Sequence, residues 1–189
     1  MPAQLTLAQS ALKELTAIYD GKANGLYGLT LVNQRAHAVQ SGYHARVQGL
    51  GASLVVAALL HDIGHMVHDL GEHPAANGID DRHENTGSDW LQRLFGPAVT
   101  EPIRLHVAAK RYLCAVEADY FGKLSNDSIE SLNLQGGRMS AEEVADFQQE
   151  PYWREAVALR RIDELAKDPK GPMPEFTEFS TEILQAAIA

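Results

Sequence analysis

The chain has 189 residues, 45% of them hydrophobic, which is enough for one domain (residues 1–189) with a sizeable core and short for two. Its formal net charge of −9 argues against a general nucleic-acid or anionic-membrane surface, so an anionic substrate must be attracted by local cations. The single cysteine, Cys114, excludes an internal disulfide and thiolate zinc motifs and fits a reducing cytoplasm, and no apolar run approaches the roughly 20 residues that span a bilayer.

The spacing of apolar residues predicts an all-α fold, because it is helical in most segments and period-two alternation is hard to find. We expect a first helix from a Thr6 cap to Gly21 and a second from about Val32 to Gln48. A third covers "LVVAALLHDIGH" at 54 to 65. Turn formers in residues 69–82 then predict a loop, followed by a helix from about His83 to Phe95.

The second half of the chain continues this pattern. Pro97 is placed to open a helix, and "GKLSNDSIESLNLQGGRM" at 122 to 139 is typical of irregular chain with short helical turns. Ser140 with Glu143 forms a capping box, and a long helix runs from about Pro151 to Lys167. The core is expected over about residues 20–168, and residues 169–189 form a tail with a short helix after the break at "DPKGPMP".

Three histidines lie inside apolar helical segments, where a neutral imidazole must find a hydrogen-bond partner: His37, His61 and His106. Each alone indicates a core histidine with a satisfied hydrogen bond. Together with the adjacent Asp62, whose side chain projects about 100° from that of His61 on a helix, they indicate a metal site. Imidazoles and carboxylates without thiolates suit iron, manganese or other first-row metals without selecting one.

The order of His37, His61-Asp62 and a distant Asp163 resembles the HD-domain superfamily of helical metalloproteins. Its dinuclear members add two histidines, and His83 and His106 occupy those positions here. The resemblance implies a helical bundle enclosing two metals, the first held by His37, His61, Asp62 and Asp163 and the second by His83, His106 and a bridging Asp62. Because most members are phosphohydrolases, the dipeptide alone favours a hydrolase acting on nucleotides.

A hydrogen-bond donor lies about one helical turn from three of these implied ligands: His65 after His61, Lys110 after His106, and Arg160 before Asp163. Two carboxylate ligands against two metals leave an excess of positive charge, which favours a compact, multiply charged anion. The alternative is that Lys110 and Arg160 are solvated or paired with Glu117, Glu155 or Glu164.

A narrower resemblance, over about residues 20–168, is to the mixed-valent diiron HD-domain oxygenases. It rests on "YGLTLVNQRAHA" at 27, "LLHDIGH" at 59, "HVAAKRYLCA" at 106, "SIESLNLQGG" at 128 and "RRID" at 160. The group most like this chain cleaves the carbon–phosphorus bond of 1-hydroxy-2-aminoethylphosphonates. That likeness implies two iron ions in the Fe(II)/Fe(III) state and dioxygen as co-substrate, with a carboxylate and inorganic phosphate as products. It also implies that the substrate contacts are His65, Lys110, Ser128, Gln135 and Arg160, and that Tyr27 covers the free metal position until substrate arrives.

Thr30 bears on which amine the substrate carries. In glycine-forming members a glutamate at this position receives a primary ammonium, and that carboxylate is absent here. A trimethylammonium donates no hydrogen bond, so Thr30 favours (R)-1-hydroxy-2-(trimethylammonio)ethylphosphonate as substrate and glycine betaine as product. Another acid could compensate for the missing glutamate: Asp69, Glu72 or Asp81.

Two other hypotheses stay open at this stage. One is the HD-type phosphohydrolase, and the other is a regulatory module that kept part of the site, which the filled ligand positions disfavour. We expect a small-molecule phosphonate as the partner, with no nucleic acid and no membrane, and the sequence does not indicate an oligomeric state. His68 and His73 lie near the predicted loop and are expected to be exposed to solvent.

Overall fold

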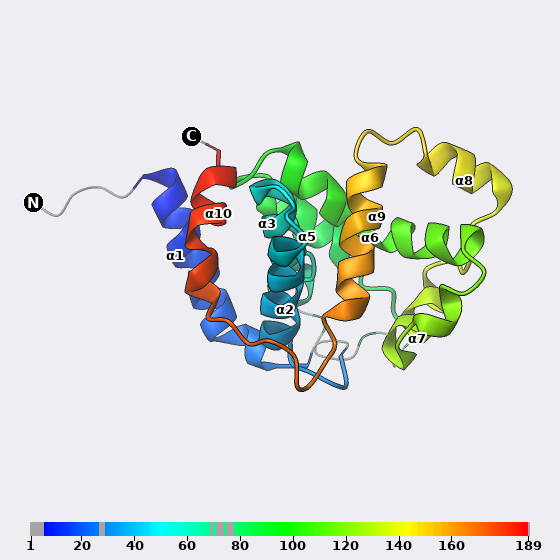
Figure 1. The fold of residues 1–189 in the computed structure, drawn as a ribbon, viewed down its shortest axis with the longest axis horizontal. Helices are drawn as coiled ribbons and strands as arrows, with labels where there is room; N and C mark the ends of the chain where they lie inside the picture. Colours follow the sequence, from blue (N-terminus) through cyan, green and yellow to red (C-terminus); the bar gives the residue numbers. More distant parts are fainter. Residues whose placement is uncertain (1–5, 27–28, 69, 71–73, 75–77, 189) are drawn as a thin grey trace, which may run out of the picture.

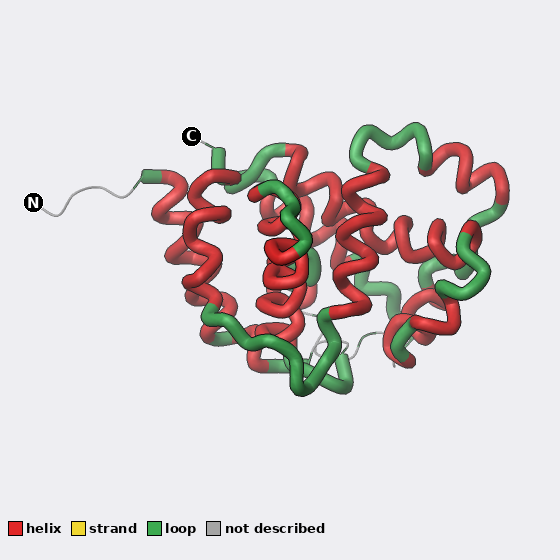
Figure 2. The backbone as a smooth tube through the Cα atoms, in the orientation of Figure 1, coloured by secondary structure: helices red, strands yellow, loops and turns green. Residues whose placement is uncertain are grey.

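The computed structural model describes residues 6–26, 29–68, 70, 74 and 78–188. Figure 2 shows helices joined by loops, with no strand in this described part of the chain, so the predicted all-α class is confirmed. The helices are α1 (Leu7–Asp20), α2 (Gln34–Val47), α3 (Ala52–Leu60), α4 (Gly64–Val67), α5 (His83–Leu91), α6 (Pro97–Val116), α7 (Asn126–Leu134), α8 (Ala141–Phe147), α9 (Trp153–Leu165) and α10 (Ser180–Ala186), with short 3-10 turns at Lys22–Asn24, Phe121–Lys123 and Phe176–Phe179.

Helix starts follow the capping chemistry of the sequence. Thr6 caps α1 in a reciprocal box with Gln9, and Ser140 caps α8 in the same way with Glu143. Pro97 lies in the first turn of α6, where a missing N–H costs nothing. These three predicted starts are confirmed.

The prediction of one continuous helix over 54–65 is wrong. Helix α3 ends at Leu60, and a turn precedes α4, which begins at Gly64. His61 Nδ1 donates a hydrogen bond to the carbonyl oxygen of Ala58 at 2.8 Å, in the last turn of α3, where backbone carbonyls lack helical partners. His61 and His65 therefore do not lie on one helix face, although both remain buried.

The segment from 122 to 139 is more regular than expected. It contains the nine-residue α7, whose N-cap Ser125 accepts a hydrogen bond at Oγ from the backbone N–H of Ser128 at 3.3 Å. The prediction of mostly irregular chain was wrong here because the serine cap lies within a run of polar residues without strong apolar periodicity. Helix α7 brings Ser128 to the site described below.

The C-terminal segment does hold the expected short helix, α10, and this helix packs into the core. Phe176, Phe179 and Ile183 are fully buried, and the Phe176 ring stacks on Tyr19 of α1 at 4.5 Å between centroids. Arg46 of α2 bonds Glu182 at 2.7 Å. Figure 1 shows α10, in red, beside α1, in blue, so the two ends of the chain close one side of the molecule.

The two larger clusters of buried hydrophobic residues share two helices, because α6 and α9 contribute to both of them. The larger cluster includes Ile103 of α6 and Leu159 of α9. The smaller one includes Leu113 of α6 and Ala156 of α9, together with residues of α7 and α8. Polar side chains on α6 and α9 are thereby held between two packed regions. None of the described helices combines the length and apolar character needed to cross a membrane.

We expect Gly64→Ala to destabilise the protein by about 3 kcal/mol or more, at the upper end of the cost of overpacking. A Cβ at Gly64 would lie 2.7 Å from the carbonyl carbon of His83, and backbone cannot move aside as a flexible side chain can. Chemical denaturation of metal-free protein measures the change. Gly122→Ala is the control, because its Cβ would meet nothing within 4 Å. Equal unfolding free energies for the two variants would contradict the close approach.

Candidate metal centre and anion cavity

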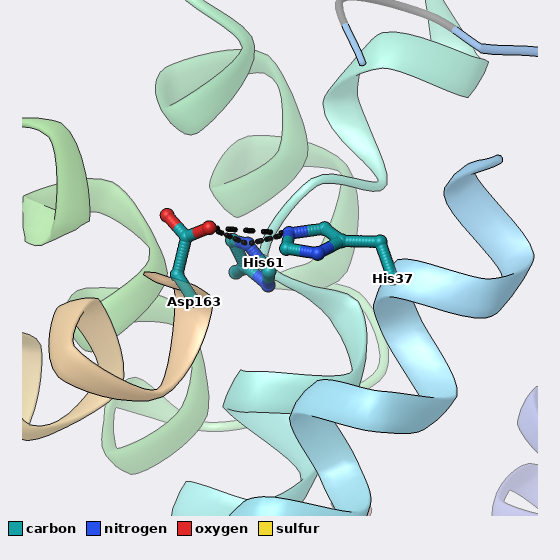
Figure 3. Close-up of side chains that lie close together, drawn as sticks. All are labelled: His37, His61 and Asp163. Atoms are coloured by element: carbon teal, nitrogen blue, oxygen red, sulfur yellow. Dashed lines mark hydrogen bonds and ion pairs between the residues drawn. The ribbon is translucent and has the colours of Figure 1, made fainter. Parts of the chain in front are cut away.

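Two imidazoles face each other between α2 and the end of α3. His37 Nε2 lies 3.1 Å from His61 Nε2, while the Nδ1 atoms of these rings lie 2.9 Å and 2.8 Å from the carbonyl oxygens of Ala166 and Ala58. A carbonyl only accepts, so each Nδ1 is the protonated nitrogen and each Nε2 has a lone pair. Asp163 Oδ1 lies 3.2 Å from His37 Nε2, and Figure 3 shows the three side chains converging.

A second imidazole pair joins α5 to α6. His83 Nε2 lies 3.2 Å from His106 Nε2. His106 Nδ1 donates to the carbonyl of Ile103 at 2.7 Å, and His83 Nδ1 donates to Asp81 Oδ1 at 2.9 Å. Burial lowers the pKa of His83, but the carboxylates of Asp81 and Asp62 more than offset this and raise the pKa to about 9. The second pair therefore favours a positive charge between its rings.

Asp62 lies between the two pairs. Its Oδ2 is 3.5 Å from His37 Nε2, and its Oδ1 is 3.4 Å from His61 Nε2 and 3.6 Å from His83 Nε2. Burial raises the pKa of Asp62, but the surrounding imidazoles more than offset this and hold the pKa well below its usual range. One ionised carboxylate thus reaches both imidazole pairs.

These residues fit two metal ions. The facing Nε2 lone pairs of His37 and His61 repel each other in a buried site unless a cation lies between them, the second pair also favours a positive charge, and each pair has a carboxylate within reach. The donors are imidazole nitrogens and carboxylate oxygens, which suit first-row divalent metals. The residues that could hold such ions include the six that the sequence singled out: His37, His61, Asp62, His83, His106 and Asp163.

A cavity of about 220 Å³ opens beside the metal-binding side chains. It is lined by Asp62, His83, His106 and Asp163, and also by most of the predicted substrate contacts, namely Thr30, His65, Lys110, Ser128, Gln135 and Arg160. The structure thus brings these residues together, and their roles stay predictions. Tyr27 lies outside the described residues.

Positive side chains converge on Ser128 in this cavity. Lys110 is buried and donates to Ser131 Oγ at 2.8 Å and to the Ser128 carbonyl at 3.4 Å. Burial, together with the charge of Arg160, lowers the pKa of Lys110 to about 7. Arg160 Nη2 donates to Ser128 Oγ at 3.1 Å and also pairs with Asp163 and Glu164. The pairing of Arg160 with Glu164, which was the alternative to anion binding at the level of sequence, is therefore present.

Sequence reasoning missed Lys167. Its ammonium lies 3.0 Å from Ser128 Oγ, 3.0 Å from Asp163 Oδ1 and 3.2 Å from Glu164 Oε1. The spacing of four residues after Asp163 was the available signal, because it places both side chains on one helix face. Lys167 lies two residues beyond Leu165, where α9 ends, and in the sequence it marks only the end of the predicted helix. It adds a third cation to the cavity.

Asp81 was considered only as a substitute acid for an ammonium group. Its carboxylate instead contacts three imidazoles, with Oδ2 2.7 Å from His65 Nδ1 and 3.3 Å from His68 Nε2, in addition to the bond with His83. The expectation that His68 is exposed is wrong, because this contact leaves its side chain 8% exposed. Asp69, Glu72 and His73 lie outside the described residues.

The mouth of the cavity carries an acid that the sequence did not single out. Thr30 donates to Asp127 Oδ2 twice, from its backbone N–H and from its hydroxyl, both at 3.0 Å. Asp127 and Glu130 of α7 both line the cavity. The Oε1 atom of Gln135 is buried there and has no hydrogen-bond partner among the described residues.

Comparisons with known proteins find relatives over most of the chain. It is 46% identical over 155 residues to hydroxymethylphosphonate dioxygenase of Gimesia maris, which covers 80% of this chain and 76% of the relative. It is 39% identical over 163 residues to [1-hydroxy-2-(trimethylamino)ethyl]phosphonate dioxygenase (glycine-betaine-forming) of Leisingera caerulea, covering 86% and 83%. An uncharacterized protein of Acanthamoeba polyphaga mimivirus is 30% identical over 136 residues, covering 71% and 62%. No family model matches the chain.

Adding Fe(II) to the metal-free protein should raise its unfolding temperature, because a metal ion relieves the facing lone pairs of His37 and His61 and supplies the positive charge that the second pair favours. Free metal at about 100 times its Kd adds about 2.7 kcal/mol of stability. Asp62→Ala should lose most of the rise, since Asp62 reaches both pairs. Asp146→Ala, an exposed acid on α8, should keep it. An equal rise in all three proteins would mean that the metal binds elsewhere.

Proposed function

The chain belongs to the hydroxyphosphonate dioxygenases, and from this premise we propose that its substrate is (R)-1-hydroxy-2-(trimethylammonio)ethylphosphonate. Dioxygen would cleave the carbon–phosphorus bond to give glycine betaine and inorganic phosphate. The observation that carries the proposal is that one cavity is lined both by three cationic side chains, Lys110, Arg160 and Lys167, and by the carboxylates of Asp127 and Glu130 near the exposed Thr30. A zwitterion with an anionic and a cationic end matches this arrangement.

The cationic end suits a phosphonate dianion. Lys110, Arg160 and Lys167 converge on Ser128, and the Ser128 hydroxyl can donate to a phosphonate oxygen. His65 lines the same cavity. Positive side chains held in a water-poor cavity attract an anion more strongly than they would at a solvated surface. We propose that these residues fix the phosphonate so that the hydroxyl-bearing carbon faces the metal-binding side chains.

The mouth suits a quaternary amine. Asp127 Oδ2 already accepts two hydrogen bonds from Thr30, which leaves mainly Oδ1 to accept from an ammonium N–H, while the carboxylate keeps its full negative charge. The apolar side chains of Leu29, Ile79 and Leu134 line the cavity with it. Methyl groups beside apolar side chains, with a carboxylate close by, are the surroundings that a trimethylammonium requires.

We propose two iron ions as the cofactor, held by His37, His61, Asp62 and Asp163 on one side and by His83, His106 and Asp62 on the other. When bound, iron supplies the dioxygen and one-electron chemistry that amino-acid side chains lack. The chain's own residues orient the substrate and limit water access. Tyr27 is proposed to cover the free metal position until substrate arrives.

A second candidate substrate is hydroxymethylphosphonate. The 46% identity to a protein of that name favours it. This substrate carries no amine, so it would leave the acidic mouth without a partner. The phosphohydrolase hypothesis receives no such support, because both characterised relatives are named as dioxygenases.

Steady-state turnover of three substrates tests the proposal: the trimethylammonio compound, its primary-amine analogue and hydroxymethylphosphonate. We expect kcat/KM to favour the trimethylammonio compound by about tenfold or more, and oxygen consumption to match phosphate release. Asp127→Asn should reduce that preference by about fivefold through the lost charge while keeping an oxygen for Thr30, whereas Asp146→Asn should leave it unchanged. A tenfold preference for hydroxymethylphosphonate would select the second candidate, and equal anaerobic phosphate release would exclude an oxygenase.

The KM for the phosphonate should rise as pH increases through neutrality. Lys110 is charged below its pKa of about 7 and loses that charge above it, so its attraction for the anion is present at low pH and disappears at high pH. The Lys110→Met variant should have a higher KM below neutral pH and approach the wild-type KM at high pH, and its pH profile should keep only the ionisation of the substrate. Superimposable profile shapes in the wild type and the variant would contradict the assignment.

A further inference from the structure

The carboxylate of Asp81 contacts two imidazoles, those of His83 and His65. Asp81 Oδ1 accepts from His83 Nδ1 at 2.9 Å, and Asp81 Oδ2 lies 2.7 Å from His65 Nδ1. The two rings stack, with centroids 4.0 Å apart and planes inclined by 22°. Both Nδ1 atoms therefore lie within hydrogen-bond distance of the same carboxylate, which is 7% exposed. The other ring nitrogen of His83, Nε2, therefore faces His106. In His65, Nε2 is the ring nitrogen that does not contact Asp81.

A third imidazole completes the surroundings of Asp81. His68 Nδ1 accepts from the backbone N–H of Leu70 at 3.1 Å, so in the neutral ring Nε2 carries the proton and donates to Asp81 Oδ2. The carboxylate is thus engaged by imidazoles on both oxygens and is not available to a substrate ammonium. Burial raises the pKa of Asp81, but its bonds to His65 and His83 more than offset this and keep the carboxyl ionised.

The backbone between Asp81 and His83 is unusual. Arg82 has φ 47° and ψ 39°, a left-handed conformation that residues other than glycine rarely adopt, and it is the only such residue in the described part of the chain. This turn lets the Asp81 side chain reach the ring of His83 two residues later. Such conformations persist where the surrounding structure requires them, often at functional sites.

We propose that Asp81 is a positioning residue shared by the second metal site and the anion cavity. By fixing the tautomer and plane of His83 it would prepare Nε2 for a metal, and by fixing His65 it would orient the imidazole that the anion meets. The inference rests on the proposed dinuclear function. It also makes a selective claim, because His37 and His61 are oriented by the carbonyls of Ala166 and Ala58 and owe nothing to Asp81.

Anaerobic titration of the metal-free protein with Fe(II), followed by calorimetry, tests the selective claim. The wild type should bind two ions. Asp81→Asn keeps one oxygen but presents an NH₂ group to an Nδ1–H donor, so the second ion should bind about 10 to 100 times more weakly, while the first binds as before. The affinity for inorganic phosphate should fall in the same variant. Asp89→Asn, an exposed acid on α5, is the matched control and should change neither affinity.

Each other outcome overturns part of the argument. Failure of the wild type to bind two ions rejects the dinuclear centre itself, and the role proposed for Asp81 at the second site fails with it. If the wild type and Asp81→Asn both bind two ions with equal affinity, the role of Asp81 is rejected, but the dinuclear centre is not. Equal weakening of both ions, with a lower unfolding temperature, indicates a general structural role. Three ions in the wild type would mean that Asp81, His65 and His68 are themselves metal ligands.

Discussion

The hydrogen bond at Nδ1 of each inward-facing imidazole is the constraint on which the site depends. His61 and His106 donate to carbonyl oxygens three residues earlier in the chain, and His37 donates to the carbonyl that follows α9. Backbone carbonyls are held by the helices, so the unprotonated Nε2 atoms face inward whether or not an ion is present. The arrangement requires facing lone pairs inside a packed interior, and a cation is the natural means of relieving them.

Charge compensation in the cavity follows from this arrangement. Glu164 accepts hydrogen bonds from Arg160, Lys167 and Ser128, the same donors that are proposed to bind the phosphonate. Burying an unpaired ion costs several kcal/mol, so a carboxylate from the chain keeps these donors paired until an anion arrives. At the level of sequence, Lys110 and Arg160 have two alternative roles. In one they are solvated or paired with a glutamate, and in the other they bind an anion. Pairing through Glu164 is compatible with anion binding because its partners Arg160, Lys167 and Ser128 line the cavity.

Much of the fold was predictable because capping residues and apolar periodicity act locally. The same holds for His61 and Asp62, which are polar interruptions in an apolar run. Asp81, Lys167 and Asp127 lacked such a signal. Each lies among polar residues or just outside a helix, and each acquires its importance from contacts made across the fold. The left-handed turn that directs Asp81 towards the histidines is likewise not encoded by a glycine, so nothing in the local pattern indicates it.

The pairing of Thr30 with Asp127 changes how the segment before α2 bears on specificity. The absence of a carboxylate at position 30 suggested that the amine site had lost its charge. Thr30 instead holds a carboxylate that belongs to the first turn of α7, where the helix dipole also favours a negative charge. The charge at the mouth is therefore retained, while two of its hydrogen bonds are spent on the protein itself. Such a carboxylate keeps its full electrostatic attraction but has fewer acceptor positions left, which reduces the advantage of an amine with N–H groups over a trimethylammonium.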